Sequence, residues 1–155
     1  PLIIIIYVMK NINVFTDPNY NEPSKKLCIS IVENILAHHS KYNYDINIIF
    51  TSDVHLSDLK KQFFSTDQWT DVIAFPLNSE NENTIEGEIY ISIPTAKENA
   101  DLFNQHYNKE LARLIVHGAL HLLGHEDDTI EKKKEMVKKE DFFLKNTLWR
   151  KLFEE

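Results

Sequence analysis

The sequence predicts an α+β fold in which about five helices pack on a small mixed four-stranded sheet. Short runs rich in β-branched and aromatic residues recur between longer segments whose apolar residues are spaced three and four apart. The chain has 155 residues, shows no internal repeat, and is 43% hydrophobic, which suffices for one buried core. We therefore expect residues 1–155 to form a single domain with helices layered on a sheet.

The first half of the chain is predicted to hold two strands and two helices. The nearly continuous β-branched and aromatic run Ile3–Val8 is typical of a buried strand. Proline is a favourable first residue of a helix, and helical spacing of apolar residues predicts one over Pro23–Ala37. Tyr44–Phe50 alternates like a second strand. A side-chain oxygen of Ser52 or Asp53 can cap a short helix that runs to residue 64.

The second half is predicted to hold two strands and three helices. The strands cover Asp71–Phe75 and Glu88–Ile93, on either side of a polar stretch from residue 78 to residue 86. One helix begins at Pro94, the next covers about Lys109–Leu123, and the last extends from about Thr129 into the 140s. The polar stretch brings no composition shift large enough to mark a domain boundary.

Composition favours a soluble cytoplasmic protein with no membrane association. The apolar run near the N-terminus is too short to span a bilayer and lacks the basic flank and cleavage site of a signal peptide. Cys28 is the single cysteine, so no disulfide can form within the chain, and its apolar neighbours predict a core residue. The formal charge of −7 disfavours a polyanionic partner unless basic residues gather locally.

Lysines do gather in the last predicted helix. They alternate with glutamates at helical spacing, which favours a solvated face with ion pairs over a dedicated phosphate track. The lysines are Lys132, Lys133, Lys134, Lys138 and Lys139, and the glutamates are Glu131, Glu135 and Glu140.

The most informative stretch reads V-H-G-A-L-H-L-L-G-H-E-D-D, from residue 116 to residue 128. On a helix, His117 and His121 fall on one face one turn apart, so two imidazoles can bind one metal ion. A continued helix would carry the next histidine roughly 12 Å along the axis from His117, too far for a shared site. Gly124 can end the helix in the left-handed conformation and let the chain turn back. The candidates for a third ligand are then His125, Glu126, Asp127 and Asp128.

A metal held in this way predicts hydrolytic chemistry. Three protein ligands leave a fourth position on Zn²⁺ for water, whose pKa the ion lowers. The spacing is similar to that of metzincin proteases, but those enzymes place a glutamate where this chain has Gly118, so peptide hydrolysis is disfavoured. A glycine inside a helix costs about 1 kcal/mol relative to alanine. Either close approach of another backbone or of substrate, or a plain packing contact, would explain Gly118.

Three segments resemble the YbeY family of bacterial endoribonucleases, which act in ribosomal RNA maturation. Residues 117–124, H-G-A-L-H-L-L-G, resemble the family signature H-G-x-L-H-L-x-G. Residues 70–76, T-D-V-I-A-F-P, resemble T-D-V-L-S-F-P, and residues 86–92, E-G-E-I-Y-I-S, resemble L-G-D-I-x-I-S. Strong matching covers about residues 70–128.

The resemblance implies one metal ion per chain, usually treated as zinc, held by three histidines separated by three and five residues. That spacing assigns His117, His121 and Asp127, with aspartate where most members have histidine. Aspartate is an established zinc ligand, although its charge could favour harder metals such as Mn²⁺ or Mg²⁺. Asp128 is the second choice for the third ligand. His125 and Glu126 would either point into the cleft or be exposed to solvent, and exposure is favoured.

Catalytic assignments depend on a second departure from the family. Members often carry an arginine before the T-D-V segment that is implicated in RNA cleavage, and alignment places Phe64 there. Either Arg113, one turn before His117, or a lysine supplies the cation instead, or the nuclease activity is weak; Arg113 could equally pair with Glu110 or Asp71. Asp71 and Glu88 lie in the matched segments; Asp71 is taken with Arg113 as a candidate catalytic residue, although such carboxylates could merely cap an element or orient a ligand histidine.

The resemblance implies a single-strand-specific endoribonuclease that acts in small-subunit rRNA 3′-end processing and ribosome quality control. Its partners would be RNA in the small ribosomal subunit and, secondarily, ribosomal proteins. The alternative is an assembly factor that binds the small subunit and keeps a structural metal without turnover. A zinc protease is a distant third reading.

Overall fold

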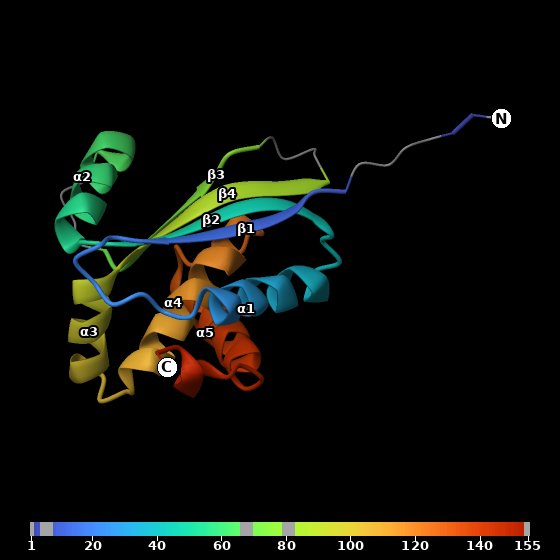
Figure 1. Cartoon of the computed structure of the whole chain (residues 1–155). Helices are drawn as coiled ribbons and strands as arrows, with labels where there is room; N and C mark the ends of the chain where they lie inside the picture. Colours follow the sequence, from blue (N-terminus) through green and yellow to red (C-terminus); the bar gives the residue numbers. More distant parts are fainter. Residues whose placement is uncertain (1, 4–7, 66–69, 79–82, 154–155) are drawn as a thin grey trace.

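The computed structural model describes residues 2–3, 8–65, 70–78 and 83–153. Its elements follow the chain in the order labelled in Figure 1. The strands are β1 (Lys10–Thr16), β2 (Asn43–Thr51), β3 (Val72–Pro76) and β4 (Thr84–Ser92). The helices are α1 (Lys25–His38), α2 (Asp53–Phe64), α3 (Ile93–Leu102), α4 (Tyr107–Leu122) and α5 (Ile130–Leu144), followed by a short 3-10 helix, η1 (Trp149–Lys151). The predicted α+β class, with four strands and five helices, is confirmed.

The four strands form one mixed sheet in the order β1-β2-β4-β3. β1, β2 and β4 are parallel, and β3 pairs antiparallel with β4. Alternate residues of β2 point to opposite faces, and its buried set, Tyr44, Ile46, Ile48 and Phe50, belongs to the hydrophobic core. The sheet therefore buries one apolar face.

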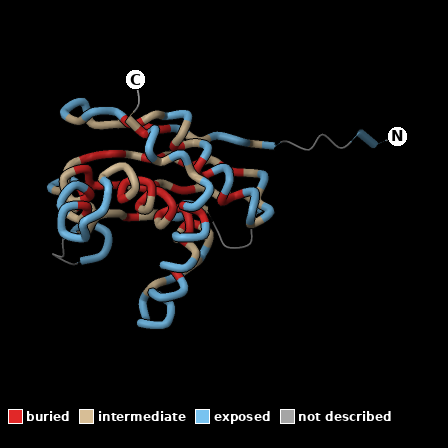
Figure 2. Tube along the Cα trace, turned by 90° about the horizontal axis from the view of Figure 1, so that it is seen from below, coloured by how far each residue is buried: buried red, intermediate tan, exposed pale blue. Residues whose placement is uncertain are grey.

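Helix α4 is the centre of the packing below the sheet. It contacts α1, α3, α5, β3 and β4, and α1, α4 and α5 lie on the same side of the sheet in Figure 1. Helix α2 lies on the other side, near β3 and β4. Buried residues gather in the middle of the molecule in Figure 2. Cys28 is one of them, as predicted. Because α4 is held by so many neighbours, side chains on its remaining face are placed by the whole fold.

The first strand of the structure, Lys10–Thr16, was not predicted, and most of the predicted strand Ile3–Val8 lies outside the described residues. Ile3 and Val8 lie outside any strand and are 83% and 54% exposed, and residues 4–7 fall outside the described part of the chain. The strand is instead Lys10–Thr16, in which polar and apolar residues alternate and Val14 enters the core. Its register is set by β2, whose apolar alternation begins at Tyr44, opposite Lys10. Pairing with β2 therefore makes Lys10–Thr16 a strand despite the three polar residues among its first four.

The remaining elements differ from prediction mainly at their ends. β4 begins at Thr84, so the last residues of the predicted polar stretch are strand residues whose side chains are partly exposed. Ser52 caps α2 by accepting a hydrogen bond from the His55 amide, and Thr129 caps α5 in the same way through Lys132. Helix η1 was not predicted. No helix in the described part of the chain is long and apolar enough to cross a membrane.

Candidate metal centre

Helix α4 presents His117 and His121 on its one face that borders a cleft. Its other sides carry buried apolar residues that fix the helix in the core. The two imidazole rings lie with their centroids 4.5 Å apart, and their Nε2 atoms are 3.0 Å apart. The four-residue spacing therefore brings two nitrogen lone pairs to one point, as the sequence predicts.

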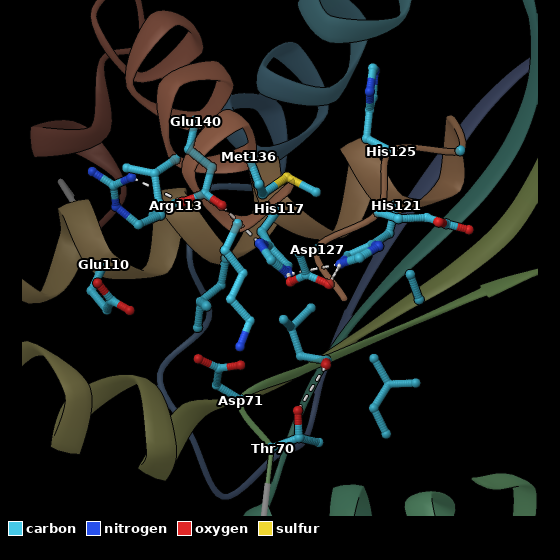
Figure 3. Close-up of a pocket in the computed structure, with 18 of the residues that line it drawn as sticks. Thr70, Asp71, Glu110, Arg113, His117, His121, His125, Asp127, Met136 and Glu140 are labelled. Carbon is cyan, nitrogen blue, oxygen red and sulfur yellow. Dashed lines mark hydrogen bonds and ion pairs between the residues drawn. The ribbon is translucent and has the colours of Figure 1, made fainter. Parts of the chain in front are cut away.

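A tight reversal follows α4 and returns a carboxylate to this point. Gly124 has φ +90°, and the amides of Gly124 and His125 donate to the carbonyls of His121 and Leu120, at 3.0 Å each. This is the Schellman pattern of a helix that ends at a left-handed residue. The chain then brings Asp127 over the two rings, with Oδ2 3.4 Å from His117 Nε2 and Oδ1 3.4 Å from His121 Nε2. Figure 3 shows the three side chains converging.

The three side chains fit a metal ion. Their ligand atoms all lie within 4.8 Å of one another. Zinc ligands at about 2.0–2.1 Å and tetrahedral angles lie about 3.3 Å apart. The two Nε2 atoms lie 3.0 Å apart, and each lies 3.4 Å from a different oxygen of the Asp127 carboxylate, which is close to that value. Two imidazoles and one carboxylate are an ordinary donor set for zinc, so this group could hold a divalent ion with one side left open to the cleft.

Glu140 supports His117 from α5. It is only 5% exposed, and its Oε2 accepts a hydrogen bond from His117 Nδ1 at 2.8 Å. A proton fixed on Nδ1 leaves Nε2 free to face the metal position. The prediction that Glu140 belongs to the solvated face of this helix is therefore wrong. Its position one turn after Met136 and three before Phe143, both buried, was the available signal.

Burial and charge act differently on the two histidines. Burial lowers the pKa of His117, but the hydrogen bond and charge of Glu140, with the charge of Asp127, outweigh it, so that pKa is raised. Burial and the neighbouring His117 lower the pKa of His121, against a smaller opposing effect of Asp127. A metal must therefore displace a proton more often at His117 than at His121.

The carboxylates of Asp127 and Asp128 have different partners in the loop after α4. Asp128 and Glu126 both pair with Lys132, at 3.2 and 2.9 Å, whereas Asp127 pairs with the two histidines. His125 neither points at the metal position nor stands free in solvent. Its Nε2 lies 2.8 Å from His39 Nε2, and Lys139 Nζ lies 2.9 Å from its Nδ1. These pairs, with the one between Lys138 and Glu135, agree with the ion-paired reading of the lysine-rich helix.

Gly118 is explained by packing. A Cβ atom there would lie 2.4 Å from Ile89 Cγ2 and 3.3 Å from Val72 Cγ2. The missing side chain leaves room for the Ile89 and Val72 side chains to pack against α4. Of the two explanations left open by the sequence, the packing contact is the one that the structure supports.

Arg113 and Asp71 both line the cleft beside the histidines. Arg113 pairs with Glu140 at 3.0 Å and with Asp141 at 2.8 Å, which are different partners from the two predicted. Asp71 Oδ2 accepts a hydrogen bond from Asn99 Nδ2 at 2.9 Å. Glu88 accepts instead from the Tyr90 hydroxyl, at 3.4 Å.

The cleft is a mixed polar and apolar hollow of about 1060 Å³. Its walls come from α2, β3, α4, the loop after α4, and α5. Its cationic side chains are Lys60, Arg113 and Lys133, and the buried Glu110 borders it near Asp71. Burial raises the pKa of Glu110, with Asp71 and Glu140 adding to the effect. A polymer of several residues could pass along such an open hollow beside the three converging side chains.

Comparison with known proteins places this arrangement in a family. The family profile described as Endoribonuclease YbeY matches residues 12–147. A relative named Endoribonuclease YbeY from Cytophaga hutchinsonii is 42% identical over 112 residues, which cover 72% of this chain and 78% of the relative. Another from Amoebophilus asiaticus is 35% identical, covering 83% and 86%. The solution structure of TM1509 from Thermotoga maritima aligns with a TM-score of 0.59 at 29% identity over 87% of each chain. The chain belongs to the YbeY family.

Proposed function

We propose that this chain is a zinc-dependent endoribonuclease that cleaves single-stranded RNA during maturation of the small-subunit rRNA 3′ end and in ribosome quality control. The activity would be carried by one domain in the cytoplasm, with rRNA and ribosomal proteins as partners. One observation carries the proposal: His117, His121 and Asp127 converge at the floor of an open cleft. The names of the relatives support ribonuclease chemistry for this geometry.

His117, His121 and Asp127 are the proposed ligands. A bound zinc ion supplies Lewis-acid polarisation of a phosphate and acidifies water. Glu140 contributes by keeping the Nδ1 proton on His117, which directs Nε2 into the cleft. We propose that Arg113 uses its remaining N–H groups to neutralise phosphate charge, because its guanidinium has five donors and lines the cleft.

Asp71 is the proposed proton acceptor. It lies on the β3 side of the cleft, opposite α4, and Asn99 fixes one of its carboxylate oxygens. The other oxygen is available to take a proton within the cleft.

The assembly-factor alternative also has an observation in its favour. Arg113 is already engaged by two carboxylates, and Phe64 stands where the family resemblance placed an arginine. Both features reduce the positive charge available to a phosphate. A protein that binds the small subunit through this face, and keeps the metal for structure alone, would show the same arrangement.

Cleavage of an unstructured RNA by the purified metal-loaded protein separates the two functions. We expect His121→Ala to abolish cleavage while its urea unfolding curve stays cooperative, because one ligand is lost. The matched control is His38→Ala, which removes an exposed histidine on α1 that contacts Phe142 and Phe143. Equal RNA cleavage by the wild type and His121→Ala would contradict the proposed endoribonuclease activity of this site. A wild type that binds small subunits but cleaves no RNA would establish the assembly factor.

A further inference from the structure

An exposed cluster of aromatic rings lies at the α2 side of the cleft. Phe63 and Phe64 from α2 contact Phe75 from β3, with ring centroids 5.3 and 5.7 Å apart. Phe75 in turn meets Tyr90 of β4 edge-on at 5.7 Å. The Phe64 and Phe75 rings are inclined by only 25°. Phe64 is thus supported from behind by a ring that the sheet holds in place.

Phe64 is nevertheless 48% exposed, and it lines the same cleft as His117 and His121. Phenylalanine is among the residues most often buried, so exposed rings gathered at a functional cleft indicate a binding surface. An exposed ring with a rigid backing loses little entropy when a flat ligand stacks on it. This part of the cleft therefore suits a planar aromatic group.

A cation accompanies the ring. Lys60 lies one helical turn before Phe64, its Nζ is 5.6 Å from the centroid of the Phe64 ring, and it also lines the cleft. A planar group that stacked on Phe64 could displace this ammonium group by a small rotation of the lysine side chain. The displaced cation would then stand beside whatever the planar group is attached to. A planar base joined to a phosphate is the ligand that matches both side chains.

We propose that Phe64 stacks an unpaired nucleobase of the RNA in the cleft and that Lys60 pairs with the adjoining phosphate. This inference rests on the proposed function and adds a subsite to it. A paired base has both faces covered, so the subsite admits single strands and tolerates any base. Stacking also suits a chain with a formal charge of −7, because it anchors RNA without relying on charge alone.

The test replaces one base at a time in a short unstructured oligoribonucleotide with an abasic nucleotide. Affinity is measured by fluorescence anisotropy with the metal-free full chain, so that the RNA stays intact. For the wild type, we expect one position at which loss of the base weakens binding about five- to tenfold. In Phe64→Ala, removal of the base at that position should cause no further loss of RNA affinity. Phe64→Trp should keep the wild-type dependence of affinity on that base.

The matched control is Phe142→Ala on α5. Phe142 is also 48% exposed, but it packs beside His38 and Phe143 away from the cleft. We expect the control to keep the wild-type dependence on base position. The same dependence in the wild type and Phe64→Ala, or no dependence in the wild type, would overturn the subsite.

Lys60→Gln tests the phosphate half of the subsite. Loss of one phosphate contact should reduce the slope of log affinity against log salt by about 0.7 for a single strand. An unchanged slope would remove Lys60 from the proposal. Failure of the subsite and failure of the proposed function are distinguishable. If the metal-loaded wild type cleaves RNA but the abasic scan gives the same result with and without Phe64, only the subsite proposal is wrong. If the wild type cleaves no RNA, the proposed endoribonuclease function is wrong.

Discussion

The two halves of the candidate metal centre are built differently. His117 and His121 project from a central helix packed against most of the fold, and one of them is held by a buried glutamate. Asp127 comes from a loop, is 34% exposed, and stands next to Asp128, which is 68% exposed and turned towards Lys132. Packing in the core therefore fixes the positions of the two histidines. The position of Asp127 depends on the chain reversal at Gly124 and a few exposed ion pairs.

The two halves should differ in how well they tolerate substitution of a metal ligand. A helix-borne ligand cannot be replaced by a neighbour, because the adjacent residues point in other directions. A loop-borne carboxylate has acidic neighbours on both sides that differ from it mainly in orientation. We therefore expect metal binding to depend more steeply on the helix half, and the loop half to accept other ligand types.

Loss of a helix ligand should have the largest effect. We expect His117→Ala to bind no stoichiometric metal under conditions that saturate the wild type, because two ligands rarely hold zinc in a protein. Metal content per chain after dialysis is the measurement. One full equivalent of metal in His117→Ala would contradict the assigned role of α4.

Substitution of the loop carboxylate comes next. Asp127→Asn should weaken metal binding by more than about tenfold. Asp128→Asn should leave affinity near that of the wild type, because its carboxylate faces Lys132. Asp127→His should retain the metal, since imidazole is also a zinc ligand. Competition with a chromophoric chelator gives the three affinities. A larger loss in Asp128→Asn than in Asp127→Asn would reverse the assignment.

Glu140→Gln tests what supports the helix half. Removing this carboxylate's charge should lower metal affinity about 10- to 100-fold. It should also lower the pKa of His117 in the metal-free protein, because Glu140 is the main group that raises it. An NMR titration measures the pKa of His117. The control is Asp141→Asn, because Asp141 also pairs with Arg113. Unchanged affinity and an unchanged His117 pKa would show that the contact has no such role.

Two glycine substitutions should have the smallest effects on metal binding. They should mainly change the stability of the fold. Gly118→Ala should destabilise the fold by about 1–3 kcal/mol, because the new methyl group meets Ile89. Gly124→Ala should cost roughly 1–2 kcal/mol through its left-handed backbone, with open space around the new methyl group. Urea unfolding of the metal-free proteins gives both values. A more stable Gly118→Ala would mean that helix propensity outweighs the close contact.

What the sequence predicted follows the same division. Helix geometry places His117 and His121 on one face, and a glycine at position 124 indicates the end of the helix. Both features can be recognised in the local sequence alone. The preference for Asp127 over Asp128 came from a family resemblance, since local rules treat the two alike. The spacing of Glu140 from Met136 and Phe143 indicates a buried position, but its contact with His117 depends on the packing of α5 against α4, which no local pattern specifies.

The strand Lys10–Thr16 was missed for a related reason. Its own β propensity is weak, yet it pairs with β2 along its whole length and so joins the sheet. Likewise, the partners of Arg113 come from α5 and could not be read from its own helix. Local patterns predicted element types well, but contacts between distant segments required the fold.

The position of a bound zinc ion would show whether α4 and the following loop share one metal centre. Crystals of the protein loaded with zinc, measured on both sides of the zinc absorption edge, would locate it by anomalous scattering. We predict one peak per chain, about 2.0–2.1 Å from Nε2 of His117, Nε2 of His121 and a carboxylate oxygen of Asp127. A peak elsewhere, or one bound by the two histidines with Asp127 turned away, would contradict a centre shared between α4 and the loop that follows it.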